Sequence, residues 1–173
     1  DPSPSFDAEW VFFSYFPDVR TASLNYQRRN APRSGADIYK IHVRTRQVVR
    51  LTNQEWSPAE GAANWSSNPL TANPPGTYYL GYGIFNLGPM PLPGGRIAFT
   101  SNRNGFQPPK GYTNPTLQLY VMDEDGSNVT AIAPMSIGST LHPTVLADGR
   151  IMFSTYESQG LRDRRLWGMW TIW

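Results

Sequence analysis

Short apolar runs beside turn residues dominate the chain. Trp10–Ser14 is one such run, and the segments 96–100 and 150–154 align with it without gaps. A few apolar, aromatic or β-branched residues next to a turn are typical of a buried β-strand. No long stretch carries a clean helical stripe, and the best helix-like window, residues 54–63, contains a proline and a glycine. The pattern therefore predicts an all-β protein.

A hairpin pattern, two apolar strands around a polar turn, also recurs. Residues 37–52 form one copy, and residues 117–132 can be laid over it so that Tyr39 falls on Tyr120. A third copy starts at Arg164. We therefore interpret the chain as a repeated antiparallel sheet. Each unit is expected to have an inner strand, which is the apolar run described above, then a variable loop and an outer hairpin.

One such unit cannot bury both of its faces, so units of this kind stack radially around a channel. The predicted fold is all-β: a partial β-propeller of two to three four-stranded antiparallel blades, in one domain over residues 1–173. We expect blade 1 at about 1–52, an insertion at 53–82, blade 2 at about 83–133 and an incomplete blade 3 at about 134–173. A closed propeller needs about four to eight blades, so the chain would supply part of a ring.

Both recurring segments resemble the TolB-type propeller repeat, also called PD40 or WD40-like. In that repeat an Asp/His-Pro turn and an Asp-Gly turn precede a strand ending in Phe-x-Ser. A hairpin with a second Asp-Gly turn then leads to a strand ending near Leu-Thr. The residues that carry the match are Asp1-Pro2-Ser3, Leu51-Thr52, Asp125-Gly126, His142-Pro143-Thr144, Asp148-Gly149 and Phe153-Ser154. The resemblance implies a propeller fold and says little about function, because one fold hosts many functions.

A narrower resemblance is carried by residues 95–113 and 139–173, which look like the middle propeller domain of the hydrazine synthase alpha subunit and its relatives. In that family the haems lie outside such repeats and need cysteine motifs. This chain has no cysteine. None of the family's catalytic apparatus can therefore be carried onto a residue here, and we expect no cofactor in this chain.

Composition narrows the classes of function. The formal net charge is +2 and most basic residues are scattered, whereas a nucleic-acid-binding protein of this size should show a stronger, clustered excess. The lack of cysteine excludes disulfides and cysteine-ligated zinc within the chain. No apolar run is long enough for a membrane span. The TolB-type resemblance implies a periplasmic or extracellular location, with the remaining blades or domains of a parent protein, or partner subunits, as partners.

His142 is a candidate ligand residue. It precedes Pro143 at the start of a predicted inner strand, which would place it near the mouth of the propeller channel, where ligands bind. The alternative is a structural histidine that bonds to the backbone of a neighbouring blade. With only two histidines and no cysteine in the chain, a zinc site is not expected.

A second group of candidate ligand or interface residues follows the third predicted inner strand: Tyr156, Glu157, Arg162 and Trp167. Arginine beside aromatic rings suits an anionic or sugar ligand. Alternatively, the basic run 162–165 pairs with Glu157 and Asp163 on the surface, and Trp167 packs between blades.

Residues 123–128, DEDGSN, fit two interpretations. Alternating oxygen ligands and a glycine resemble a calcium loop, but the distal glutamate of an EF-hand is missing. Asp-Gly is also the chemistry of a hairpin turn, because glycine accepts a positive φ. We predict the turn and no metal.

Three hypotheses of function remain. The first is a non-catalytic scaffold or interaction module of a larger, exported bacterial protein. The second is the propeller domain of a haem-dependent, hydrazine-synthase-like or peptidase-like enzyme, where it would shape an active site supplied by other domains. The third is a carbohydrate-binding propeller that uses its tryptophans. We expect no catalytic activity in this chain alone.

Overall fold

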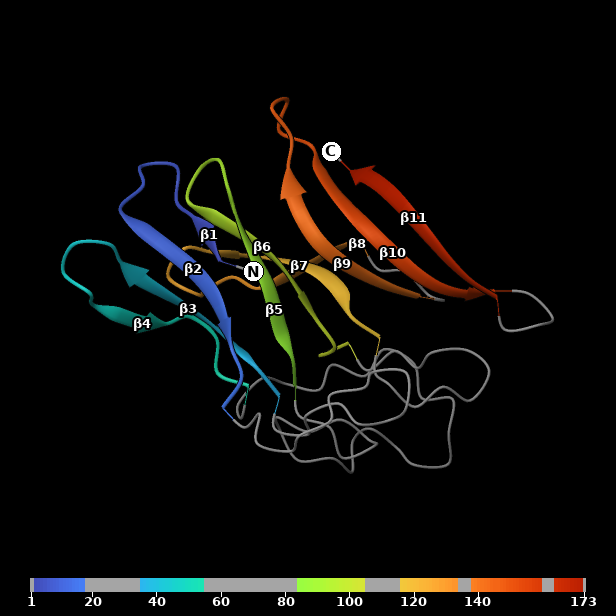
Figure 1. Cartoon of the computed structure of the whole chain (residues 1–173), viewed down its shortest axis with the longest axis horizontal. Coiled ribbons are helices and arrows are strands. Elements are labelled where there is room, and N and C mark those ends of the chain that lie inside the picture. Colours follow the sequence, from blue (N-terminus) through green and yellow to red (C-terminus); the bar gives the residue numbers. More distant parts are fainter. Residues whose placement is uncertain are drawn as a thin grey trace.

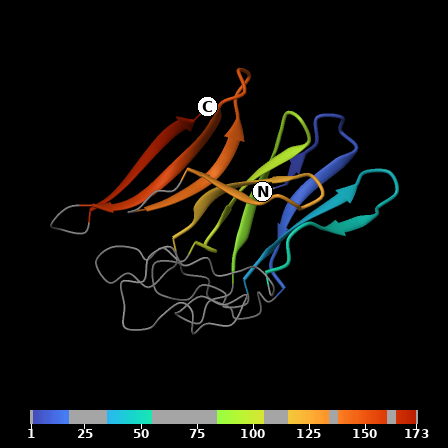
Figure 2. The same cartoon turned by 180° about the vertical axis from the view of Figure 1, so that it is seen from behind.

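The computed structural model describes residues 2–17, 35–54, 84–104, 116–133, 138–159 and 164–172. In these ranges the regular structure consists of strands in three antiparallel sheets, and no helix is present. The all-β prediction is thus confirmed. Figures 1 and 2 show the three sheets side by side, with the third at the C-terminal side.

The first two sheets have four strands each, and the strands follow one another in sequence order. Sheet 1 consists of β1 (Ser3–Pro4), β2 (Trp10–Tyr15), β3 (Asp37–His42) and β4 (Val48–Arg50). Sheet 2 consists of β5 (Asn86–Leu92), β6 (Arg96–Ser101), β7 (Gln118–Asp123) and β8 (Thr130–Ala133). In sheet 3 the described strands are β9 (Gly138–Val145), β10 (Ile151–Gln159) and β11 (Arg164–Ile172). This meander of antiparallel strands is the form of a propeller blade.

The recurring apolar runs are the second strands of their sheets, β2, β6 and β10, and not the inner strands as predicted. A further strand precedes each of them: β1, β5 and β9. β5 lies against both β1 and β9, so these first strands converge and are the inner ones. The sequence pattern concealed them because they contain prolines. Proline is tolerated in a sheet chiefly at an edge or a bulge, and the inner strands are edges.

Two apolar layers hold the three sheets together. The layer between sheets 1 and 2 contains Phe12, Ile38, Leu51, Ile97, Phe99, Tyr120 and Met122. The layer between sheets 2 and 3 contains Ala98, Leu119, Val121, Ile151 and Phe153. Sheet 2 therefore buries alternate residues of each strand on opposite faces, which explains why its strands are almost continuously apolar.

The turn between β7 and β8 also joins sheets 1 and 2. Gly126 has a φ of 91°, and a β-carbon placed on it would lie 2.1 Å from the backbone oxygen of Leu51. Asp125 accepts hydrogen bonds from the backbone and hydroxyl of Ser127, and Asp123 accepts one from the Asn128 amide. DEDGSN is thus a hairpin turn, and its glycine is needed both for conformation and for space.

In the described part of the chain, no helix is long and apolar enough to cross a membrane.

Candidate functional site

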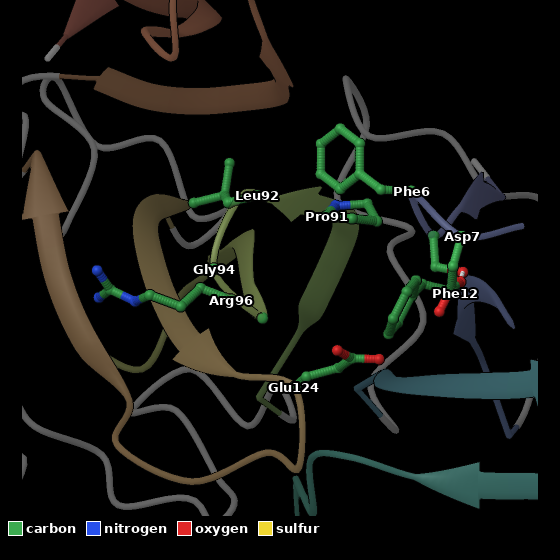
Figure 3. A pocket seen from close by; sticks show the side chains of 10 residues that line it. Phe6, Asp7, Phe12, Pro91, Leu92, Gly94, Arg96 and Glu124 are labelled. Carbon is green, nitrogen blue, oxygen red and sulfur yellow. Dashed lines mark hydrogen bonds between the residues drawn. The ribbon is translucent and has the colours of Figure 1, made fainter. Parts of the chain in front are cut away.

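A cleft of about 230 Å³ lies between sheets 1 and 2, at the end where the β1–β2, β5–β6 and β7–β8 turns meet. Phe12 and Pro91 supply apolar wall. The carboxylates of Asp7 and Glu124 lie on either side of the Phe12 ring, and the guanidinium of Arg96 points away from them (Figure 3). The cleft therefore combines an apolar wall with two acidic side chains.

Both carboxylates already have partners within the chain. The Ser5 hydroxyl and then the Glu9 backbone N–H donate to Asp7, and these bonds lower the pKa of Asp7 below its ordinary value. Glu124 Oε1 lies 3.5 Å from Lys40 Nζ, which also donates to the Glu124 carbonyl at 3.1 Å. These bonds order the turns and tie sheet 2 to sheet 1.

The opposite end of the same two sheets holds an ion pair between a buried carboxylate and an exposed guanidinium. Asp37, the first residue of β3, is 3% exposed. Its Oδ2 accepts a hydrogen bond from Arg50 Nη2 at 2.6 Å, and its Oδ1 accepts one from Thr52 Oγ1 at 2.7 Å. Thr52 Oγ1 in turn accepts from the backbone N–H of Ile38. Because both oxygens are bonded, the cost of burying this charge is largely offset.

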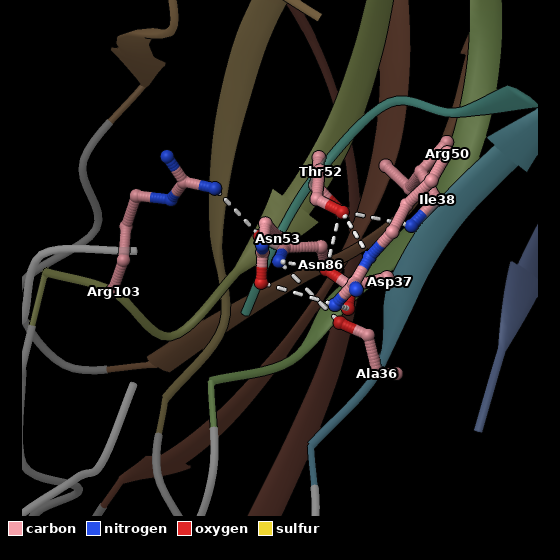
Figure 4. Close-up of polar contacts among 8 residues, drawn as sticks. All are labelled: Ala36, Asp37, Ile38, Arg50, Thr52, Asn53, Asn86 and Arg103. Carbon is pink, nitrogen blue, oxygen red and sulfur yellow. Dashed lines mark hydrogen bonds and ion pairs between the residues drawn. The ribbon is translucent and has the colours of Figure 1, made fainter. Parts of the chain in front are cut away.

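Asn86, the first residue of β5, extends this network into sheet 2 (Figure 4). Its Nδ2 lies 3.4 Å from both the Ala36 carbonyl and Asp37 Oδ1, and its Oδ1 accepts from Arg103 Nη2 at 2.7 Å. Backbone bonds run in parallel, from Ala36 to the Ile84 carbonyl and from Asn86 to the Ala36 carbonyl. Side chains and backbone thus join the first residues of β3 and β5.

Arg103 closes the network in sheet 2. Its guanidinium carbon lies 5.4 Å from the centre of the Phe99 ring and 5.3 Å from that of Tyr120. Its Nε lies 3.3 Å from Ser101 Oγ. Cation–π interactions with the two rings stabilise the guanidinium, which is buried away from water. We call Asp37, Arg50, Thr52, Asn86 and Arg103 the polar clasp.

The polar clasp is suited to joining sheets rather than to chemistry. Its carboxylate and amide are committed to neighbouring strands, and its charges lie in an ion pair and over aromatic rings. Among the described residues, no three His, Asp or Glu side chains are grouped so that they could hold a metal ion. What the arrangement can do is fix the geometry of this end of the sheets.

An open apolar face lies on the far side of sheet 1. The ring centres of Phe13 and Tyr39 are stacked 5.9 Å apart, and Tyr15 meets Tyr39 edge-on at 5.5 Å. Tyr15 is 50% exposed and Val48 is 54% exposed. The apolar residues that share this face by strand register are Val11, Phe13, Tyr15, Tyr39, Ile41 and Val48. Arg50 lies opposite Tyr39 on the same face, with its guanidinium carbon 6.0 Å from the centre of that ring. An exposed patch of apolar and aromatic side chains is typical of an interaction surface.

His142 lies within β9 and not at the start of a strand, which corrects the predicted position. It has a φ of 52° beside a bulge in the β9–β10 pairing, and its side chain is exposed. Its Nδ1 lies 3.3 Å from Ser154 Oγ, whose hydroxyl donates to the Leu141 carbonyl. The Ser154 hydroxyl therefore links the imidazole to the backbone of β9. The role of His142 as a ligand stays a prediction.

The β9–β10 bulge has a counterpart in sheet 2. Gly88-Pro89 occupies the place of His142-Pro143, with a φ of 60° at Gly88 and a shift in the β5–β6 register. Thr100 donates to the Leu87 carbonyl there, as Ser154 does to Leu141. The bulge therefore belongs to the repeat, and the exposed imidazole is what sheet 3 adds to it.

The remaining predicted site residues lie in or beside the β10–β11 hairpin. The strand register places Tyr156 opposite Trp167, and Glu157 opposite Leu166. Arg162 lies outside the described residues. Their proposed role in binding a ligand or a partner stays a prediction.

Sequence reasoning missed the polar clasp. The sequence pattern places Asp37 in a hairpin, Asn86 in blade 2, and Arg103 in the variable loop of that blade. A signal was present, because Asp37 and Asn86 begin strands and Arg103 lies two residues after the end of one. That pattern did not show that two residues 49 positions apart would meet.

Comparisons with known structures report on the fold. The chain is similar to the TolB structure from Agrobacterium tumefaciens, with 19% identity and a TM-score of 0.55, covering 91% of this chain and 38% of that one. It is also similar to TolB from Acinetobacter baumannii, with 20% identity and a TM-score of 0.52, covering 97% of this chain and 28% of that one. The fold is that of a TolB-type β-propeller.

The chain thus spans 38% of one TolB structure and 28% of the other. Its three open sheets fit a partial propeller. No protein-family model matches the chain, and no curated protein matches it in sequence. The narrower resemblance to the hydrazine synthase alpha subunit is not confirmed by these structures and stays a prediction.

Proposed function

We propose that the chain is a non-catalytic scaffold and interaction module, a TolB-type propeller segment that joins further blades, domains or subunits of a larger exported protein. The observation that carries this proposal is the pair Phe13–Tyr39. The equivalent pair in sheet 2, Phe99–Tyr120, has the same stacked geometry and is buried under sheet 1. A surface of the same kind in sheet 1 therefore calls for a covering partner.

The polar clasp supports a structural role as well. It uses buried charged and amide groups to join sheets 1 and 2, in a fold whose units cannot bury both faces alone. A periplasmic or extracellular location forms part of the proposal through the TolB-type fold. Two alternatives stay hypotheses: a propeller that shapes an active site supplied by other domains, and a carbohydrate-binding propeller.

Site-specific photo-crosslinking tests the proposal. A photoreactive phenylalanine analogue at position 15, on the open face, should form a covalent adduct with a polypeptide partner in extracts of the source cells. The same analogue at Phe6, which is 70% exposed on the β1–β2 turn, is the control and should form none. The proposal is wrong if the two positions give the same adducts, or if neither gives one.

A further inference from the structure

The cleft between sheets 1 and 2 has walls from both sheets and an apolar interior (Figure 3). Phe12, which is buried, lies at its base, and Phe6, which is exposed, lies at its mouth. Pro91 and Leu92 of β5 add apolar wall. Its volume of about 230 Å³ is below the range of about 300–1,000 Å³ that is typical of sites for drug-sized ligands. The cleft therefore suits the apolar part of a molecule no larger than a single amino acid.

Each of the two carboxylates in the cleft has one oxygen that the described residues do not use. Oδ1 of Asp7 accepts both of the hydrogen bonds given above, and no described residue donates to its Oδ2. Lys40 Nζ approaches Oε1 of Glu124, whereas a β-carbon added to Gly95 would lie 3.9 Å from Oε2. Gly95 thus leaves space beside that oxygen. Because the two carboxylates lie on either side of the Phe12 ring, they favour a cationic donor in the cleft.

The chain already holds one ammonium group in these surroundings. Lys40 Nζ lies 6.0 Å from the centre of the Phe12 ring and 3.5 Å from Oε1 of Glu124. Cation–π and Coulomb interactions both stabilise an ammonium group in such a place. Lys40 balances the charge of Glu124, and the guanidinium of Arg96 points away from the cleft (Figure 3). The charge of Asp7 is therefore left for a ligand.

The equivalent place between sheets 2 and 3 lacks these groups. Ala98 takes the position of Phe12, and the β5–β6 turn has two glycines, residues 94–95, where the β1–β2 turn has an aromatic and an acidic residue. Asp148 on the β9–β10 turn accepts from Arg150 through both of its oxygens. Two sheets of this chain thus pack together without an aromatic base or unused carboxylate oxygens. These groups are additions to the repeat, which indicates that they serve something other than packing.

We propose that the cleft binds a small organic cation, a primary amine with a compact apolar part. The ammonium group hydrogen-bonds to Asp7 and Glu124, and the apolar part lies against the rings of Phe6 and Phe12. This site goes beyond the proposed function, because its ligand is a small molecule and not a polypeptide.

Titration of the isotope-labelled chain with phenethylamine, followed by two-dimensional amide NMR spectra, tests the site. The amide signals of Asp7, Gly95 and Glu124 should shift and reach saturation. Phenethyl alcohol, which is neutral and has the same shape, should bind about 5-fold more weakly, because a charged donor forms the stronger hydrogen bond to a carboxylate. The absence of saturable shifts at these residues, or equal binding of the alcohol, overturns the proposal.

Two variants separate the contributions of charge and ring. Asp7→Asn should weaken the binding of phenethylamine about 2- to 5-fold and leave that of the alcohol unchanged. Phe6→Ala, a change at an exposed side chain, should weaken amine binding by a similar factor of about 2 to 5. It carries the test if the amide spectrum of Asp7→Asn shows that the fold is lost.

Asp148→Asn is the matched control, because this aspartate lies on the equivalent turn of sheet 3 and is paired within that turn. Its affinity for phenethylamine should equal that of the wild type. If Asp7→Asn and Phe6→Ala both bind phenethylamine as the wild type does, or if Asp148→Asn weakens binding as much as they do, the cleft is not the site and the proposal is wrong.

The two proposals can fail separately. A polypeptide adduct at position 15 does not involve the cleft, and amine binding by the purified chain requires no polypeptide partner. A failed titration therefore leaves the interaction module intact, and a failed crosslink leaves the amine site intact.

Discussion

The same aromatic pair occurs in two surroundings within one chain. Phe99 and Tyr120 stack with ring centres 5.8 Å apart and are buried between sheets 1 and 2. Phe13 and Tyr39 stack at 5.9 Å on the open face of sheet 1 and remain partly exposed. Since the geometry is nearly identical, strand register within a sheet sets the stacking. The neighbouring sheet decides how much apolar surface leaves water, and hence how much the pair contributes to stability.

The largest expected effect comes from truncating the buried member of this comparison. Phe99→Ala should lower the free energy of unfolding by about 3–5 kcal/mol, because it leaves a cavity between two sheets. Phe13→Ala in the purified chain should cost about 1–2 kcal/mol, since its ring is already partly in water. Urea unfolding followed by circular dichroism measures both. Equal losses would contradict the assignment of sheet 1 as an open face.

A smaller effect tests the contact that covers the buried pair. Gly126→Ala should cost about 2–4 kcal/mol, because the new methyl group meets the Leu51 carbonyl and the residue has a positive φ. Gly149→Ala is the matched control, with a φ of 87° and no atom within 4 Å of the added carbon. It should cost about 1–2 kcal/mol. The loss in unfolding free energy for Gly126→Ala minus the loss for Gly149→Ala gives the cost of the clash with sheet 1. Equal losses would mean that the Leu51 backbone moves aside without a measurable cost.

The polar clasp offers a third test of how sheets 1 and 2 are joined. Asn86→Ala removes one acceptor of Arg103 and a donor to Asp37, and should cost about 1–3 kcal/mol. Asn53→Ala, an exposed change beside the same Arg50, should cost less than about 0.5 kcal/mol. Similar losses in the two variants, measured by urea unfolding, would show that the clasp does not stabilise the junction.

The smallest effect concerns the β9–β10 turn, which does not depend on a neighbouring sheet. Hydrogen bonds from the Arg150 side chain and backbone lower the pKa of Asp148. A pKa that is lower in the folded state contributes stability above the unfolded value of about 3.9, and this contribution is lost as the pH falls through the folded pKa. Asp148→Asn should therefore slightly lower the melting temperature at pH 7, and the difference should vanish in acid. If the difference in melting temperature between the wild type and Asp148→Asn stays constant from pH 7 into acid, the lowered pKa of Asp148 does not stabilise the turn.

The sequence predicted the strands that carry apolar residues and the turns that carry glycine. Trp10–Ser14, Arg96–Thr100 and Ile151–Ser154 lie in strands, and the Asp125-Gly126 turn is confirmed. These features are local, because a run of apolar residues beside a turn specifies a buried strand wherever it lies. The recurrence of these segments then predicted that each unit is an antiparallel sheet.

Two kinds of feature could not be predicted. The inner strands were hidden because Pro89 and Pro143 break the strand pattern, and only the sheet shows that they lie at an edge. The polar clasp joins Asp37 of sheet 1 to Asn86 of sheet 2, which are 49 residues apart. Strand pairing within a sheet does not predict such a contact between two sheets. The side-chain partners of a buried charge depend on tertiary packing, and the spacing of residues along the chain carries no record of it.

The prolines of the inner strands have one further consequence. Pro4, Pro89, Pro91 and Pro143 sit in the edge strands of the three sheets. A proline offers no N–H to an approaching strand, and the bulges at Gly88 and His142 interrupt the ladder. The inner edge is thus a poor template for intermolecular β-pairing, so an unclosed ring of these sheets is protected there against amyloid-like growth.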